Sequence, residues 1–309
     1  MNRILVLGSL NIDLVQHVPR LPFAGETLQG SDLQIFAGGK GANQACAAAL
    51  LGGNVDMAGK VGNDVFGQRL ADELKSAGVR TDSVRRSESR SGTAVILVLP
   101  NGENLIVISP GANADVSVDF ALTAVDSLQE GDFLLCQLEV PVAAVRAAIV
   151  SAYRKNVTTI LDPAPARALP DELLSSISIL TPNQTEAAVL LGHSQTPQEL
   201  AQAESAARDL QARGPQTVII KMGAAGCVVQ SKSSAFAVRG FQVNAVDSTG
   251  AGDTFNGALA AALARGLTIF DAVRFANAAA ALSVTKPGAI ASIPRLIEVQ
   301  EFLSLQSIA

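Results

Sequence analysis

The chain has 309 residues, of which 48% are hydrophobic and 17% are charged, and its formal net charge is −5. A chain of this length and composition can bury a large core, which excludes wholesale disorder. It has no Trp, one Tyr and no basic patch interleaved with aromatic residues, so nothing supports nucleic-acid binding.

The three cysteines, Cys46, Cys136 and Cys227, lie far apart in the sequence, and the two histidines are His17 and His193. Their spacing fits neither a metal site nor a disulfide framework, and a sparse, odd set of cysteines is typical of a reducing compartment. No run of about 18 apolar residues occurs, and the apolar N-terminal run is too short for the core of a signal peptide. We therefore expect a cytoplasmic protein without a membrane partner.

The first predicted strand is the buried apolar run Arg3–Leu7, and a helix is predicted within 37–51, opened by a glycine-rich segment. Two β-rich runs follow, Thr93–Leu99 and Asn104–Ser109, and an Asn-Gly pair lies between them. That dipeptide between two apolar runs predicts a β-hairpin.

From about residue 115 onward, predicted strands and helices alternate. The predicted strands are Phe133–Leu138, Thr158–Leu161, Ile177–Thr181, Thr217–Lys221, Gly226–Gln230 and Ala235–Val246. The predicted helices are Val142–Arg154, Glu186–Leu191, Glu199–Arg213 and Gly257–Ala264. This alternation predicts an α/β fold with a mainly parallel central sheet and helices on both faces. The hairpin does not fit the alternation, so we expect one domain over 1–309 with a small β-sheet lid formed by about 12–37 and 92–110.

Polar residues gather where predicted strands end, and ligands of open α/β sheets bind beyond the carboxyl ends of the strands. The polar positions are Asn11, Asp13, Glu139, Asp162, Asn183, Glu186, 223–226 and 247–253. Because these ends share one edge of a parallel sheet, the sequence predicts one ligand site along that edge.

The segment 247–257 has the sequence Asp-Ser-Thr-Gly-Ala-Gly-Asp-Thr-Phe-Asn-Gly. Gly250 and Gly252 permit a tight turn whose amides point outward at the start of a helix, which suits an anion. Asp253 would compete with that anion unless it is a base, taking a proton from a hydroxyl that attacks a bound phosphoryl group. The alternative is an aspartate that merely caps a helix after a glycine-rich turn.

The segment 38–44, Gly-Gly-Lys-Gly-Ala-Asn-Gln, is a second glycine-rich helix start. Lys40 and Asn43 offer polar groups there, and Asn11 and Asp13 offer more, a set that suits a polyhydroxylated ligand. The alternative is a turn that only caps the following helix. The sequence lacks a P-loop, a complete dinucleotide fingerprint and the protein-kinase motifs, and its histidines do not favour a Ser-His-Asp site.

Together, the segments 38–44 and 247–257 resemble the motifs of the ribokinase family of carbohydrate kinases. The resemblance extends over essentially the whole chain and includes 8–13, 137–139, 162–167, 181–186 and 286–289. It implies ATP-dependent phosphorylation of D-ribose to D-ribose 5-phosphate, with Mg²⁺ and K⁺ as further cofactors. It also implies a homodimer formed through the lid.

The resemblance also implies roles for individual residues. Asp253 would deprotonate the 5-hydroxyl, and the amides of Gly250, Ala251 and Gly252 would form the anion hole. The implied sugar site is Asn11, Asp13, Gly39, Lys40, Gly41, Ala42, Asn43, Glu139 and Asp253. The implied nucleotide site is Asn183, Glu186, Lys221, Met222, Gly223, Ala224, Ala225, Gly226, Gly252 and Asn277, with Asn183 and Glu186 organising Mg²⁺ through water.

The K⁺ site implied by the resemblance consists of Asp247, Thr249, Ser283, Lys286, Gly288 and Ser292. Lys286 would have to bind the cation through its carbonyl oxygen, because an ammonium group cannot. The alternative for this segment is a plain helix C-terminus stopped by Pro287 and Gly288.

Other functions remain open. A kinase of 2-deoxyribose, a ketose or a nucleoside would share the catalytic motif and differ in its sugar contacts. The spacing of Asn11 and Asp13 favours ribose, and the scarcity of aromatic residues disfavours a stacked nucleoside base. A sugar sensor without catalysis would be expected to lack Asp253 or the anion hole, and both are intact.

Overall fold

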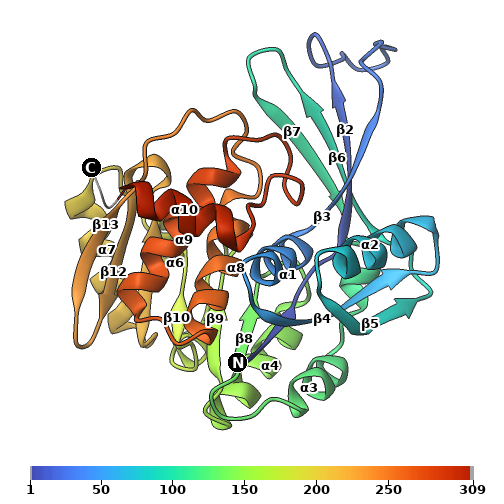
Figure 1. Ribbon diagram of the computed structural model, residues 1–309. Helices are drawn as coiled ribbons and strands as arrows, with labels where there is room; N and C mark the ends of the chain where they lie inside the picture. Colours follow the sequence, from blue (N-terminus) through green and yellow to red (C-terminus); the bar gives the residue numbers. More distant parts are fainter. Residues whose placement is uncertain (1, 307–309) are drawn as a thin grey trace.

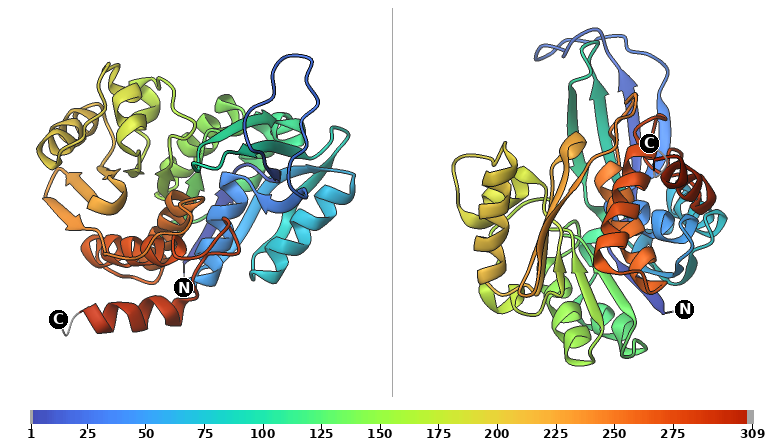
Figure 2. Two further views of the ribbon diagram at one scale, coloured as in Figure 1. Left: turned by 90° about the horizontal axis from the view of Figure 1, so that it is seen from above. Right: turned by 60° about the vertical axis from the view of Figure 1, so that its left-hand side comes forward.

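The computed structural model describes residues 2–306, which form a nine-stranded sheet with helices on both faces and a separate four-stranded sheet (Figures 1 and 2). In spatial order the large sheet contains β13 (Ala235–Arg239), β12 (Gly226–Ser231), β11 (Thr217–Lys221), β10 (Ile179–Leu180), β9 (Thr158–Leu161), β8 (Phe133–Cys136), β1 (Arg3–Leu7), β4 (Asn54–Gly62) and β5 (Arg80–Ser87). The pairs from β5 to β11 are parallel, and β12 and β13 add an antiparallel edge. The predicted fold class is confirmed.

The large sheet is buried on both faces, as alternate residues of β1 illustrate. Ile4 and Val6 belong to one apolar core, and Leu5 and Leu7 to another. The first core includes residues of α1 (Lys40–Leu50), α2 (Val65–Ser76), α8 (Ala251–Ala264), α9 (Ile269–Ser283) and α10 (Leu296–Gln306). The second includes residues of α3 (Val118–Asp126), α4 (Val142–Arg154), α5 (Asp171–Leu174), α6 (Gln184–Leu191) and α7 (Leu200–Ala212). Because both faces are covered, the central strands are continuous apolar runs rather than alternating ones.

The strand order reverses direction between β1 and β8. From β1 the chain adds β4 and β5 on one side, and from β8 it adds β9, β10 and β11 on the other. The segments that follow β1 and β8 therefore diverge and leave a crevice at the carboxyl ends of the strands, where open α/β sheets bind ligands. Residues 9–11 and 137–139 lie in these two segments.

The small sheet projects from the body of the molecule (Figure 1) and has the order β3 (Gln34–Gly38), β2 (Asn11–His17), β6 (Gly92–Val98) and β7 (Asn104–Ser109). Strands β2 and β6 are parallel, and the other two pairs are antiparallel. The β6–β7 pair confirms the predicted hairpin. Because β2 begins only three residues after β1 ends, the small sheet starts at the crevice.

Two predicted boundaries are wrong by six or seven residues, and several others differ by one or two. The strand predicted for Ala235–Val246 ends at Arg239, because its partner β12 begins at Gly226, which pairs with Arg239, and offers no further residues. The helix predicted from Gly257 starts six residues earlier, at Ala251, because the glycine-rich turn itself supplies its first turn. Within the described residues, no helix is long and apolar enough to cross a membrane.

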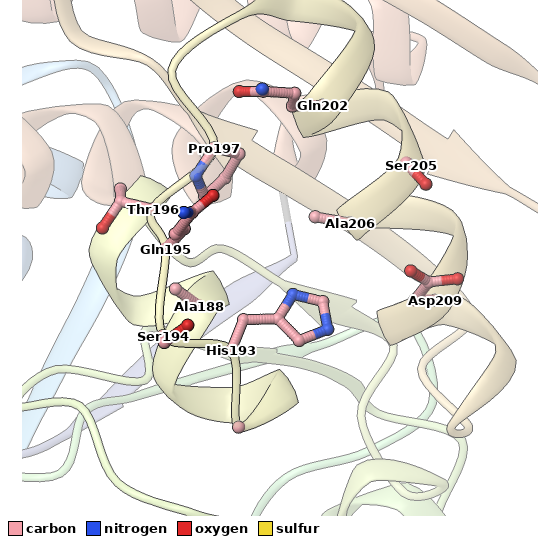
Figure 3. A pocket seen from close by; sticks show the side chains of 11 residues that line it. Ala188, His193, Ser194, Gln195, Thr196, Pro197, Gln202, Ser205, Ala206 and Asp209 are labelled. Atoms are coloured by element: carbon pink, nitrogen blue, oxygen red, sulfur yellow. The ribbon is translucent and has the colours of Figure 1, made fainter.

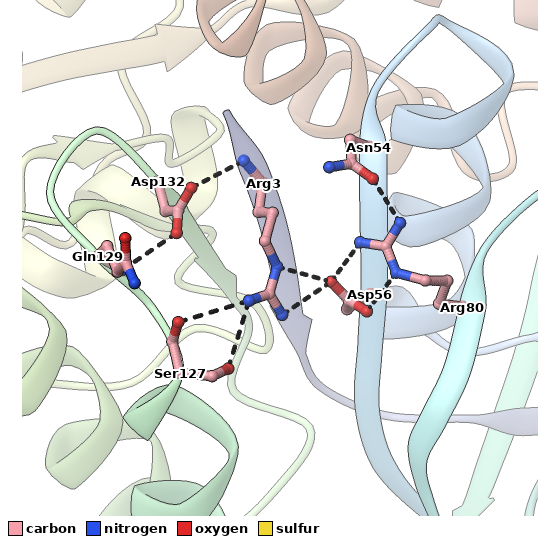
Figure 4. A network of polar contacts seen from close by, with 7 residues as sticks. All are labelled: Arg3, Asn54, Asp56, Arg80, Ser127, Gln129 and Asp132. Carbon is pink, nitrogen blue, oxygen red and sulfur yellow. Dashed lines mark hydrogen bonds and ion pairs between the residues drawn. The ribbon is translucent and has the colours of Figure 1, made fainter. Parts of the chain in front are cut away.

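A charged network joins β1, β4 and β5 near their amino ends, at the edge opposite the crevice (Figure 4). Asp56 accepts from Arg3 and Arg80, with Nη2–Oδ2 distances of 3.1 and 2.6 Å. The backbone amide of Arg3 donates to Asp132 at 2.9 Å. Arg80 is exposed and Arg3 is partly exposed, and ion pairs open to solvent contribute about 0–1 kcal/mol each. The network therefore acts mainly on the alignment of the three strands.

Candidate active site

The helices α1 and α8 begin side by side in the crevice. Gly39 and Gly250 precede them with φ angles of 87° and 73°, a backbone conformation that favours glycine. The helices pack closely, because a Cβ on Gly257 would lie 2.6 Å from the carbonyl oxygen of Gln44 and 2.6 Å from Cβ of Ala47. This packing brings the two glycine-rich motifs of the sequence to one place.

Asp253, in the first turn of α8, is 6% exposed. Its Oδ2 accepts a hydrogen bond from Nδ2 of Asn43, and its Oδ1 accepts one from Nε2 of Gln44, each at 2.9 Å. Burial raises the pKa of Asp253, while the charge of Lys40 and the two amides oppose that rise. A buried carboxylate held on both oxygens, with a raised pKa, is suited to accept a proton from a bound hydroxyl.

Asp253 faces a cavity of about 430 Å³, here named the central cavity. The residues that line it come from five separate segments: Lys40, Asp162, Asn183–Glu186, 221–223 and 248–253. Within the last two segments, Met222 and Thr249 do not face the cavity. No side chain caps α8 at Gly250, so amides of its first turn are left for a ligand. The amide of Ala251 is an exception, because it already donates to the carbonyl of Ser248, at 3.2 Å. The predicted base and anion hole thus share one cavity.

Two lysines bring positive charge to the central cavity. Lys221 Nζ lies 2.9 Å from Oδ1 of Asp162 and 3.6 Å from the position that a Cβ on Gly252 would occupy. Burial alone would lower the pKa of Lys40, but nearby carboxylates, Asp253 foremost, raise it above its usual value. Lys40 therefore stays charged at neutral pH, and the cavity is suited to an anion.

Asn183 and Glu186 form the capping box of α6. The amide of Glu186 donates to Oδ1 of Asn183 at 2.8 Å, and the amide of Asn183 donates to Oε2 of Glu186 at 2.7 Å. Burial raises the pKa of Glu186, and the charge of Lys221 opposes this. Both residues also line the central cavity, as the sequence predicts.

The predicted sugar residues lie where the small sheet joins the body. Glu139 Oε2 accepts from Oγ of Ser9 at 2.5 Å and from the amide of Lys40 at 3.1 Å. Burial, followed by the charges of Glu139 and Asp253, raises the pKa of Asp13 to about 7. Asp13 thus lies close enough to Glu139 and Asp253 for their charges to act on it. Gly41 and Ala42 are buried, and a Cβ on Gly41 would lie 2.6 Å from the backbone of Ser9, so these two act in packing.

Asn113 also belongs to this region, although no role is predicted for it. It lies just beyond β7, and its Nδ2 donates to Oδ1 of Asn11 at 2.7 Å and to the carbonyl of Leu10 at 3.0 Å. Its Oδ1 accepts from the amide of Leu10 at 2.9 Å. A Cβ on Gly92 would lie 2.3 Å from both Oδ1 of Asn11 and Nδ2 of Asn113, so this contact needs glycine there. Because Oδ1 of Asn11 is occupied, Asn11 offers its Nδ2 to a ligand.

A second cavity of about 330 Å³ is here named the side cavity. It shares five lining residues with the central one: Lys221, Gly223, Ser248, Ala251 and Gly252. Asn277 lines it, and its Nδ2 donates to the carbonyl of Val238 at 3.3 Å. The rest of the lining includes Ala224, Gly226, Phe241, Val243, Phe255 and Val284. Of the residues predicted for the nucleotide, Met222 and Ala225 line neither cavity, and Met222 is buried in the second core.

The two segments predicted to bind K⁺ lie together beside the start of α8. Asp247 Oδ1 accepts from Oγ1 of Thr249 at 2.6 Å, and its Oδ2 accepts from the amide of Gly288 at 2.8 Å. These hydrogen bonds lower the pKa of Asp247 against the effect of its burial. Ser283 and Ser292 are buried, with their hydroxyls bonded to backbone carbonyls. The Lys286 ammonium pairs with Glu298 instead.

A hollow of about 540 Å³ lies between α6 and α7, and Figure 3 shows the side chains that line it. Its lining includes His193, Gln202 and Asp209, and none of the predicted site residues. The chemistry assembled from separate motifs therefore lies in the central cavity and not in this larger hollow.

The chain is similar to known proteins over nearly its whole length. Residues 1–296 match the pfkB family of carbohydrate kinases. The ribokinase of Haemophilus influenzae is 42% identical, over 96% of this chain and 97% of that protein. The deoxyribokinase of Salmonella typhi is 36% identical, over 98% and 99%. The structure of Arabidopsis thaliana ribokinase complexed with ribose and ATP has a TM-score of 0.90 and 34% identity, and covers 98% of this chain and 99% of that chain.

Proposed function

Because the chain belongs to the pfkB family of carbohydrate kinases, we propose that it transfers the γ-phosphoryl group of ATP to the 5-hydroxyl of D-ribose, giving D-ribose 5-phosphate and ADP. The chain is a sugar kinase. The observation that carries the assignment is the position of Asp253, which faces the central cavity beside the uncapped start of α8 and is held by Asn43 and Gln44.

In the proposed reaction, Asp253 takes the proton of the 5-hydroxyl as the oxygen attacks the γ-phosphorus. The amides of Gly250 to Gly252 and the charges of Lys40 and Lys221 stabilise the negative charge on the moving phosphoryl group. The side cavity, with Asn277, holds the nucleoside part of ATP. Its connection to the central cavity through Lys221, Gly223 and Gly252 supports this placement.

Asn183 and Glu186 would hold Mg²⁺ through water, and the ion would neutralise charge on the phosphates. In the part of the chain that the structure describes, no three His, Cys, Asp or Glu side chains gather to hold a metal. Such a thin set fits Mg²⁺, which usually keeps several waters and binds substrate phosphates with one or two carboxylates. We also place a K⁺ site between 247–249 and 283–292, where it would order the loop that precedes α8.

We propose that the small sheet is a lid that closes over the sugar and joins two copies of the chain. Asp13 and Asn11 lie on its strand β2, so closure would complete the sugar site. Four consecutive apolar residues of β7, Leu105 to Ile108, are about half exposed. An exposed apolar sheet of this kind is suited to pair with a second lid. The cysteines are free and buried, which supports a reducing cytoplasm.

A kinase of 2-deoxyribose is the second candidate, since a deoxyribokinase is 36% identical to the chain. The two candidates separate in one assay: ADP release with ribose, 2-deoxyribose, fructose, adenosine and pseudouridine. Ribose should give the highest kcat/KM. A higher value for another sugar would reassign the substrate, and no release with any of them would favour a sensor.

A further inference from the structure

A column of side-chain amides lies beneath the central cavity, and its members take no direct part in the proposed reaction. Gln44 is fully buried, and its Nε2 donates to Oδ1 of Asp253 and to Oδ2 of Asp162, each at 2.9 Å. Its Oε1 accepts from Nε2 of Gln137 at 2.6 Å. One amide group therefore bridges the base and a second buried carboxylate.

The second carboxylate leads to the phosphate side of the cavity. Oδ1 of Asp162 pairs with Nζ of Lys221 at 2.9 Å, and Lys221 lies beside Gly252 in the anion hole. A continuous set of polar contacts thus connects Asp253, Gln44, Asp162 and Lys221. Its four members come from α8, α1 and the ends of β9 and β11, which fixes the distance between the two ends.

The type and the orientation of residue 44 both matter. Two buried carboxylates near one another repel, and an uncharged group with two N–H donors can bind both. Gln137 sets the orientation, because its Nε2 requires the oxygen of Gln44 to face it. Within residues 2–306, Oε1 of Gln137 has no hydrogen-bond partner, and a Cβ on Gly8 would lie 2.0 Å from it. Glycine at position 8 thus leaves the room that Gln137 needs.

We propose that Gln44 is a positioning residue that holds the carboxylate of Asp253 ready for the sugar hydroxyl and links it to the Asp162–Lys221 pair. This inference rests on the proposed function. The charged groups that face Asp253 are Lys40 of α1, Asp162 after β9 and Asp13 of β2. Burial raises the pKa of Asp253, and Gln44 opposes that rise. Without the Gln44 amide, a smaller fraction of Asp253 is ionised at neutral pH.

The test is the pH dependence of kcat in Gln44→Met, which keeps the side-chain length and removes the amide. A hydrogen bond to a charged group shifts a pKa by about one unit or more, so the acid limb of the kcat profile should move up by roughly one unit, with up to about 10-fold lower kcat on the acid side of the limb and recovery at higher pH. KM for ribose should change by less than about 3-fold, since Gln44 does not touch the sugar. Gln68→Met is the matched control, because exposed Gln68 also donates to an aspartate, Asp72, at 2.9 Å. Gln68→Met should leave the pH profile of kcat unchanged.

Urea unfolding provides a readout that does not depend on activity. Because the pKa of folded Asp253 is raised, its burial costs stability as the pH rises through that pKa. Gln44 reduces this cost, so the destabilisation by Gln44→Met should grow as the pH rises and should grow less in an Asp253→Asn background. Suppose instead that Gln44→Met lowers stability equally at every pH, both in the unsubstituted protein and in Asp253→Asn, and that its kcat profile is not shifted. Gln44 would then be only a packing residue. If no sugar is phosphorylated, the proposed function fails, whereas the unfolding experiment still decides the role of Gln44.

Discussion

The side-chain amide of Asn43 donates to Oδ2 of Asp253 across 2.9 Å, although 210 positions separate the two residues in the sequence. Asn43 belongs to the first turn of α1 and Asp253 to the first turn of α8. Both helices therefore direct their N-terminal ends, which carry partial positive charge, at the same cavity. This arrangement favours a phosphoryl group beside a base that can activate its acceptor.

Sugar specificity should depend on Asp13. Its carboxylate can accept from two neighbouring hydroxyls of ribose, and 2-deoxyribose lacks one of them. Hydrogen bonds to charged groups contribute about 1.5–3 kcal/mol, so kcat/KM for 2-deoxyribose should be roughly 10- to 150-fold lower. Asp13→Ala should impair ribose severely and narrow this ratio. Steady-state kinetics of the unsubstituted protein and of Asp13→Ala, each with both sugars, checks this prediction. Equal kcat/KM values for ribose and 2-deoxyribose in the unsubstituted protein would favour a broader pentose kinase.

Ribose binding should weaken as the pH falls. The pKa of Asp13 is raised to about 7, so acidification protonates it and removes a charged acceptor. We expect up to about 10-fold weaker ribose binding at about pH 6 than at pH 8, with proton release on binding. Calorimetry in the Asp253→Asn background isolates Asp13 from the base. Adding Asp13→Asn should flatten the dependence, and a dependence that persists would assign it to another group.

Asn113→Ala should raise KM for ribose by roughly 2- to 10-fold, the value of one or two neutral hydrogen bonds. The substitution frees Oδ1 of Asn11, so the donor that Asn11 offers to the sugar is no longer fixed. The matched control is Asn101→Ala in the exposed β6–β7 turn, where Asn101 accepts from the amide of Glu103. Unchanged ribose kinetics in Asn113→Ala would remove Asn113 from the sugar site.

Potassium should activate the enzyme. Replacing Na⁺ by K⁺ at equal ionic strength should raise kcat, because a cation between 247–249 and 283–292 would order the turn before α8. The hydrogen bond from Gly288 to Asp247 already ties these segments together. Equal rates in Na⁺ and in K⁺ would exclude the site.

The local sequence pattern predicts much of this fold. Arg3–Leu7 and Thr217–Lys221 are strands and Val142–Arg154 is a helix, each with the predicted bounds. The strand predicted over 235–246 failed because pairing depends on the length of β12, which the segment itself does not encode. No element is predicted within 54–87, where β4, α2 and β5 lie.

The two glycine-rich motifs locate the ends of the site, because each combines a glycine-rich helix start with polar or charged residues that can bind a ligand. The contacts of Gln44, Asp162 and Asn113 could not be predicted in the same way. Gln44 and Asp162 are 118 positions apart, and Asn113 is 102 positions from Asn11. These side chains come together only because α1 packs against α8 and because the small sheet joins the body of the molecule beside them. A buried glutamine in a glycine-rich motif was the one signal available.

The central claim is that Asp253 is the base of an ATP-dependent ribose kinase. The most direct test is to measure kcat of Asp253→Asn with ribose and ATP, while ATP binding and thermal unfolding confirm that the fold is retained. We predict that kcat falls by at least about 10²-fold, the usual effect of losing a general base, with ATP affinity unchanged. Turnover close to that of the unsubstituted protein would contradict the account.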